Sequence, residues 1–202
     1  MRVSFFLTFV SLVSVGFAGP AIISFTSPAL FGSQDNSLGY QFHVNSNIGV
    51  SALGYWDVGG LNNTHAVGIF SSGGLLLGSA NVGPGASVIG NFGYANLGST
   101  LNLSSGQDYF IAGTTLGNDN WVFQANGIVT DPSVNYVGSF FVSGTSGVLT
   151  FPSAPAAGRQ YMEVNFLIGS ASTTPEPASV VLIGLGLGGL WFLKRSGSRL
   201  GA

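Results

Sequence analysis

Only two histidines occur in the chain, and general acid–base chemistry near neutral pH most often uses this side chain. His43 falls on the polar side of an alternating stretch, which favours a solvated surface position. His65 follows a loop that holds Asp57 and Asn62, and it could bond to either. Because short polar side chains at strand ends most often anchor loops, we expect that role rather than a catalytic pair. Serines abound, but there is no G-x-S-x-G elbow.

Two acids about 5–10 Å apart in a cleft would support glycoside hydrolysis. The candidates are Asp35, Asp57, Asp108, Asp119, Asp131 and Glu163. Most of the aspartates fall in predicted turns, where Asp is favoured for its local backbone bonds. Glu163 lies opposite the apolar side of the last predicted strand, so we expect it to be exposed. Nothing selects a pair, and we expect no catalytic residue and no enzyme.

Loop oxygens could also bind calcium, which takes carboxylate and carbonyl ligands. The possible donors are Asn118-Asp119-Asn120 and Asp57 with Asn62-Asn63. No EF-hand or calcium-binding repeat is present, and the absence of cysteine excludes thiolate sites. We therefore expect no metal and no other cofactor.

Several aromatic residues could stack against a sugar: Tyr55-Trp56, Tyr94 and Trp121-Val122-Phe123. Trp56 aligns with the apolar residues of its predicted strand, so we expect it in the core. Tyr55 points to the opposite side and is the better surface candidate. The sequence does not identify a ligand.

The body of the protein carries few charges. Charged residues make up 6% of the chain, against about 25% in ordinary proteins, and 32 residues are glycine. Residues 19–177 contain all seven acids and a single cation, Arg159, which gives a net charge of −6. Such a surface cannot neutralise many phosphates, so we expect no nucleic-acid binding.

Period-two alternation dominates this body and predicts short strands separated by turns. They are expected at 38–44, 48–56, 64–70, 75–82, 88–94, 108–114, 120–125, 136–143, 147–151 and 161–168. Residues 71–74, Ser-Ser-Gly-Gly, are expected to form a hairpin loop. No helical period precedes residue 178. The pattern predicts an all-β, antiparallel sandwich or barrel over residues 19–169.

One local motif favours the sandwich. Leu103, Gly106 and Tyr109 have the spacing of a tyrosine corner, in which the tyrosine bonds back to upstream backbone and the leucine enters the core. Residues 38–114 resemble the jelly-roll-type domains of bacterial surface proteins, through the segment 65–70, the glycine turn after it, Leu75-Leu76-Leu77 and the Tyr109 corner. The resemblance implies a jelly-roll-like β-sandwich with no fixed activity.

Residues 1–18 have the features of a secretory signal peptide. Arg2 supplies the positive start, an apolar stretch follows, and small residues precede the expected cut between Ala18 and Gly19. The alternative is an uncleaved N-terminal anchor, but serines interrupt the short apolar stretch.

The tail predicts a membrane anchor. Residues 178–193 contain no charge, and as a helix they would extend about 24 Å, near the ~30 Å of a hydrocarbon core. Lys194 and Arg195 follow immediately, which predicts a cytoplasmic tail at 194–202. The alternative, a buried core helix, would need a polar side that the segment lacks.

This tail resembles the PEP-CTERM sorting signal of bacterial exosortase substrates. The matching residues are Pro175-Glu176-Pro177 in the linker 170–177, the Leu/Gly-rich span 180–193, and Lys194-Arg195. The basic cluster is thinner than is usual in that family. Membership implies export, an exosortase-type enzyme as partner, and an envelope that often carries exopolysaccharide. The sequence thus favours an exported structural or adhesive protein. A polysaccharide hydrolase and a permanently anchored single-pass protein are the alternatives.

Overall fold

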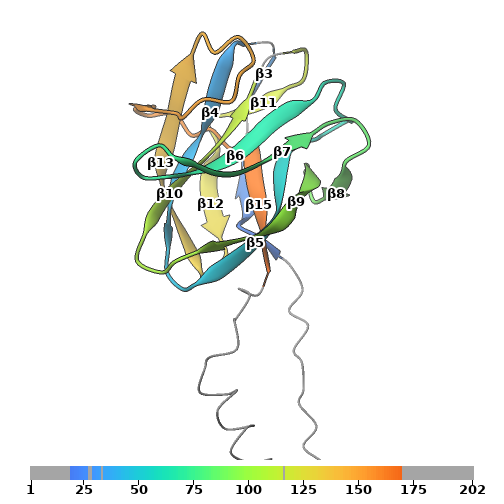
Figure 1. The fold of residues 1–202 in the computed structure, drawn as a ribbon. Coiled ribbons are helices and arrows are strands. Elements are labelled where there is room, and N and C mark those ends of the chain that lie inside the picture. Colours follow the sequence, from blue (N-terminus) through green and yellow to red (C-terminus); the bar gives the residue numbers. More distant parts are fainter. Residues whose placement is uncertain (1–18, 27–28, 33, 116, 170–202) are drawn as a thin grey trace, which may run out of the picture. The chain divides into compact units, whose positions relative to one another are not determined.

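The computed structural model describes residues 19–26, 29–32, 34–115 and 117–169 (Figure 1). No helix in these ranges is long and apolar enough to cross a membrane. The predicted signal peptide at 1–18, the linker at 170–177, the helix at 178–193 and the tail at 194–202 lie outside the described residues.

Two antiparallel sheets form a sandwich-like arrangement. The first contains, in spatial order, β1 (Gly19–Pro20), β15 (Val164–Gly169), β5 (Ile48–Trp56), β9 (Phe92–Leu103) and β8 (Ser87–Ile89). The second contains β14 (Ala154–Pro155), β13 (Val134–Ser143), β4 (Asn36–Val44), β10 (Asp108–Thr114), β6 (His65–Ser71) and β7 (Leu76–Val82). The all-β class and the antiparallel sandwich are confirmed.

Two short ribbons supplement the sheets. β3 (Ala29–Phe31) pairs with β11 (Trp121–Phe123), and β2 (Ile22–Thr26) pairs with β12 (Asn126–Thr130). In Figure 1 the β3–β11 ribbon lies at the upper end of the sandwich, beside the ends of β4 and β13. This position matters below, because the ribbon carries Phe31 and Trp121.

The main core lies between the two sheets, where Phe42 of β4 meets Phe166 of β15 at a centroid distance of 4.9 Å. β5 is buried on its other side too, because Trp56 packs against Phe25 of β2 at 5.4 Å. Trp56 is 6% exposed, so its predicted core position is confirmed. The predicted surface position of Tyr55 is wrong, since Tyr55 faces the second sheet and is fully buried.

Several strand predictions need correction. The single strand expected at 88–94 is a hairpin, because Gly90 takes a positive φ of 62° and Ile89 of β8 pairs with Phe92 of β9. Residues 147–151 form no strand, and β9 continues through 95–103, where none was expected. By contrast, β10 and the hairpin loop at 71–74 match the prediction.

The tyrosine corner is confirmed. The Tyr109 hydroxyl accepts a hydrogen bond from the Ser104 N–H at 3.1 Å, and Leu103 is 1% exposed. Gly106 between them has a φ of 74°, a conformation that glycine adopts without strain. The corner closes the turn between β9 and β10, and so joins the two sheets.

Candidate functional site

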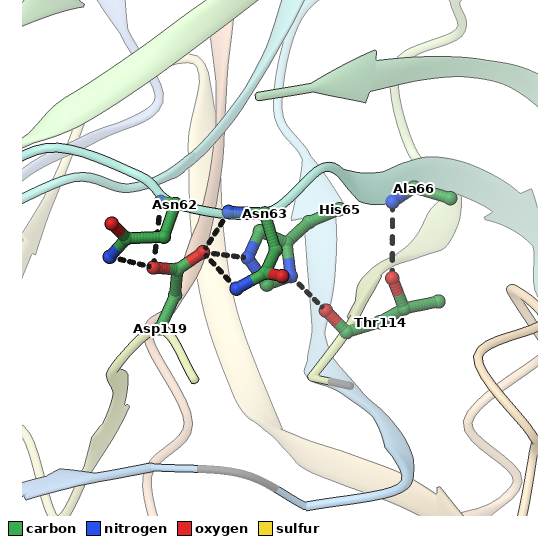
Figure 2. A network of polar contacts seen from close by, with 6 residues as sticks. All are labelled: Asn62, Asn63, His65, Ala66, Thr114 and Asp119. Carbon is green, nitrogen blue, oxygen red and sulfur yellow. Dashed lines mark hydrogen bonds and ion pairs between the residues drawn. The ribbon is translucent and has the colours of Figure 1, made fainter. Parts of the chain in front are cut away.

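A buried polar network ties the loop before β6 to the loop before β11. Asp119 Oδ1 accepts from the backbone N–H and side-chain amide of Asn62, at 2.8 and 3.0 Å (Figure 2). Asp119 Oδ2 accepts the same two bonds from Asn63, at 2.7 and 3.2 Å, and one from His65 Nε2 at 3.0 Å. His65 Nδ1 lies 2.7 Å from the Thr114 carbonyl. We call these five residues the Asp119 clasp.

The clasp contains a buried ion pair. Both ring nitrogens of His65 face atoms that can only accept, a carbonyl and a carboxylate, so the form of the ring that bonds to both is the doubly protonated one. The resulting imidazolium lies parallel to the Tyr55 ring, 3.9 Å away, and is fully buried. Burial alone would raise the pKa of Asp119, but the bonds from Asn62, His65 and Asn63 outweigh burial and hold that pKa well below its usual range.

The clasp is suited to positioning rather than to reaction. Its carboxylate oxygens are occupied by five N–H donors, which leaves the predicted calcium donors Asn62, Asn63 and Asp119 bonded to one another. Among the described residues, no group of three or more His, Asp or Glu side chains is placed to hold a metal. His65 anchors a loop as predicted, but the expected partners, Asp57 or Asn62, are wrong, because its ring bonds to Asp119 and to the Thr114 carbonyl.

Trp121, two residues after Asp119, lines a groove of about 270 Å³ at the end of the sandwich. We call it the aromatic groove. It is lined by Phe31, Gln34, Asn36, Leu38, Trp121, Phe123, Phe141, Ser143, Arg159 and Tyr161. The lining therefore combines five aromatic rings with amide and hydroxyl groups and one cation.

The β3–β11 ribbon places the aromatic rings. Trp121 pairs directly with Phe31, and the two rings stack at 5.4 Å with an interplanar angle of 29°. Phe123, two residues on, presents its ring to the same side and meets Phe31 edge to face at 5.1 Å. Val122 points the opposite way and is fully buried in the main core. The alternation thus anchors the ribbon through Val122 and leaves three rings along the groove.

The polar side chains of the groove are available to a ligand. Gln34 and Asn36 make no side-chain hydrogen bond within the described part of the chain, although the Thr115 hydroxyl bonds to their carbonyls. The Trp121 indole nitrogen, by contrast, is buried beneath the groove surface and lacks a partner among the described residues. Phe31 is 48% exposed, so in the stacked pair of Phe31 and Trp121 it is the Phe31 ring that faces solvent.

The model of one protein family matches residues 26–168, well over half of the chain, and its description is a domain of unknown function (DUF4082). The chain belongs to this family. No curated protein matches it. The DUF4082 match includes every residue of the Asp119 clasp and of the aromatic groove, so both are parts of the DUF4082 domain itself.

The remaining acids of the DUF4082 domain are dispersed. Asp108 bonds to His43 at 2.7 Å on a half-exposed sheet surface, which confirms the surface position predicted for His43. Asp131 bonds within its own turn, to Ser133. The predicted exposure of Glu163 is wrong: it is fully buried, and burial raises its pKa to about 8.

Sequence reasoning found part of the groove. It named Trp121 and Phe123 as possible sugar-stacking residues, but it gave no signal for Phe31, Gln34 or Tyr161, which the DUF4082 fold brings in from other segments of the chain. Two signals were present: the Trp-Val-Phe alternation and the single cation of the body, Arg159. Of the predicted processing residues, Gly19 begins β1, whereas Ala18, Pro175, Glu176, Pro177, Lys194 and Arg195 lie outside the described residues.

Proposed function

We propose that this is an exported bacterial envelope or extracellular-matrix protein with a structural or adhesive role. Its jelly-roll-like sandwich contacts polysaccharide through the aromatic groove, and it has no enzymatic activity. The observation that carries the proposal is the groove, in which the half-exposed Phe31 ring stacks on the buried Trp121 ring and meets Phe123 edge to face.

Sugars suit such a wall for a physical reason. The faces of a pyranose ring carry C–H groups that pack on aromatic rings, while its hydroxyls need hydrogen-bond partners at the edges. Gln34, Asn36 and Ser143 supply amide and hydroxyl groups around the rings. A concave, mostly apolar surface with a few placed polar groups is the usual form of a small-ligand site.

The distribution of the carboxylates supports binding rather than hydrolysis. A glycoside hydrolase needs two acids across one cleft. Within the described ranges no Asp or Glu lines the aromatic groove, Asp119 is bonded within the clasp, and Glu163 is buried. The hydrolase alternative therefore gains no support.

Sorting is proposed to depend on the tail. The Pro175-Glu176-Pro177 motif, the apolar span 178–193 and Lys194-Arg195 are the features expected of a substrate for an exosortase-type enzyme. Deletion of residues 175–202 should release the protein from the envelope into the medium, as measured by fractionation and immunoblotting. Continued membrane association of the truncated protein would contradict this. Intact-mass analysis of envelope protein then distinguishes a processed tail, cut near Glu176, from a permanent anchor.

Binding is tested by Phe31→Ala. Phe31 is half exposed, so its removal should cost little folding free energy but should lower affinity for a polysaccharide at least several-fold, because one stacking face is lost. Calorimetry or affinity electrophoresis against purified envelope polysaccharide measures this. The matched control is Leu75→Ala, an exposed apolar residue outside the groove. Equal affinities of both variants and the parent protein would refute the role of the groove.

A further inference from the structure

The aromatic groove contains an uncompensated positive charge. Arg159 is the only Lys or Arg in the part of the chain that the structure describes. Its guanidinium carbon lies 5.6 Å from the centre of the Phe123 ring. The ion pairs within the described ranges both involve histidine, so Arg159 has no carboxylate partner there.

Asp35, the acid next in sequence to groove-lining residues, is not a carboxylate partner for Arg159. Asp35 lies between Gln34 and Asn36, but its Oδ1 accepts from the Thr145 hydroxyl at 3.3 Å and from the Gly147 N–H at 3.2 Å. These bonds hold the Asp35 carboxylate to the loop after β13. The positive charge of Arg159 is therefore left for a ligand.

The chemistry of arginine restricts what that ligand is. A guanidinium that stacks on a ring keeps its N–H groups at the edge, where they form a planar fork. That fork matches a carboxylate, with which it makes two parallel, charge-assisted hydrogen bonds. On the other side of Phe123, the half-exposed Phe31 ring presents a face against which a flat, C–H-rich surface packs.

We infer that the aromatic groove binds an acidic polysaccharide, with the carboxylate of a hexuronate unit on Arg159 and the sugar ring against Phe31. The inference rests on the proposed function and names the class of saccharide. A neutral polysaccharide would leave Arg159 without an anionic partner.

The negative net charge of the body does not oppose this binding strongly. Asp108 and Asp119 are each bonded to a histidine within the fold, and burial raises the pKa of Glu163 to about 8, which favours its neutral form at pH 7. Exposed charges more than about 8 Å away are screened at physiological ionic strength. Among the described residues that line the groove, Arg159 is the charged one.

The test measures how tightly the exported protein binds the charged and the uncharged form of the same oligosaccharide. Short oligogalacturonates and oligomannuronates are titrated as free acids and as methyl esters, which keep the sugar ring but remove the charge. We expect the acid form to bind roughly tenfold more tightly than the ester. Arg159→Gln should abolish this preference. Arg159→Lys, which keeps the charge but loses the fork, should retain only part of it.

The outcomes separate the inference from the proposed function. If acid and ester bind equally well but Phe31→Ala weakens both, the groove binds saccharides and the inference is wrong. If Arg159→Gln keeps the acid preference, the carboxylate lies elsewhere and the inference is again wrong. If no form of either probe, and no envelope polysaccharide, binds, both are overturned. Arg159 is exposed, so thermal melting should show that its variants remain folded.

Discussion

Asp119→Asn should lower the free energy of unfolding by about 3–5 kcal/mol, because it leaves the charge of His65 buried without its partner. His65 is fully buried and Asp119 is 5% exposed, so water cannot replace the lost carboxylate. The new amide NH2 would also face other donors, either those of Asn62 at the Oδ1 position or those of Asn63 and His65 at the Oδ2 position. Equilibrium denaturation at pH 7 measures the loss.

The matched control is Asp131→Asn, which makes the same substitution at a carboxylate that bonds only within its own turn, to Ser133. We expect it to cost about 1 kcal/mol. A similar cost for both variants would show that the clasp contains no special ion pair.

The pH dependence of the Asp119 effect has a defined sign. Because the pKa of Asp119 is held well below its usual range in the folded protein, its contribution is present above the unfolded pKa near 4. That contribution is lost as the pH falls toward the folded value. The stability difference between the parent protein and Asp119→Asn should therefore shrink below about pH 4.

The same variant should also weaken saccharide binding, because Asp119 lies two residues before Trp121 of the aromatic groove.

Glu163→Gln should have the opposite effect, stabilising the protein near neutral pH. Burial raises the pKa of Glu163 from 4.5 to about 8, so the folded protein holds a proton that the unfolded chain releases. The contribution of Glu163 is full below the unfolded pKa and falls as the pH rises through the folded value. Between pH 5 and pH 8 the loss is roughly 3–4 kcal/mol.

Glutamine keeps the shape of the side chain and does not titrate, so the slope of unfolding free energy against pH should flatten over this range. Denaturation curves at pH 5, 6.5 and 8 measure it, with Asp35→Asn as a control that should leave the slope intact. The groups that couple to Glu163 are the tyrosines Tyr40, Tyr55 and Tyr136, whose pKa values burial raises further above 10. An unchanged slope in Glu163→Gln would mean that Glu163 ionises in the folded protein as it does in water.

Individual residues show which features of the fold the sequence predicted and which it did not. The spacing of Leu103, Gly106 and Tyr109 predicted the tyrosine corner, because all the determinants of this turn lie within a few residues. The alternation of Leu38, Tyr40 and Phe42 likewise predicted a strand with one buried side. Glu163 and Tyr55 were placed wrongly, since alternation assumes that one side of a strand faces water, whereas β5 and β15 are covered on both sides by segments remote in sequence.

By itself, then, the sequence determined the all-β antiparallel class, several strands and turns, and the chemical character of the body, since these depend on local periodicity and composition. Only the tertiary structure decided that Asp119 meets Asn62, Asn63 and His65, and that Phe31, Trp121 and Arg159 share one groove. These residues lie 38 to 128 positions apart in the sequence. Their pairing follows from strand order and register, which no local pattern encodes.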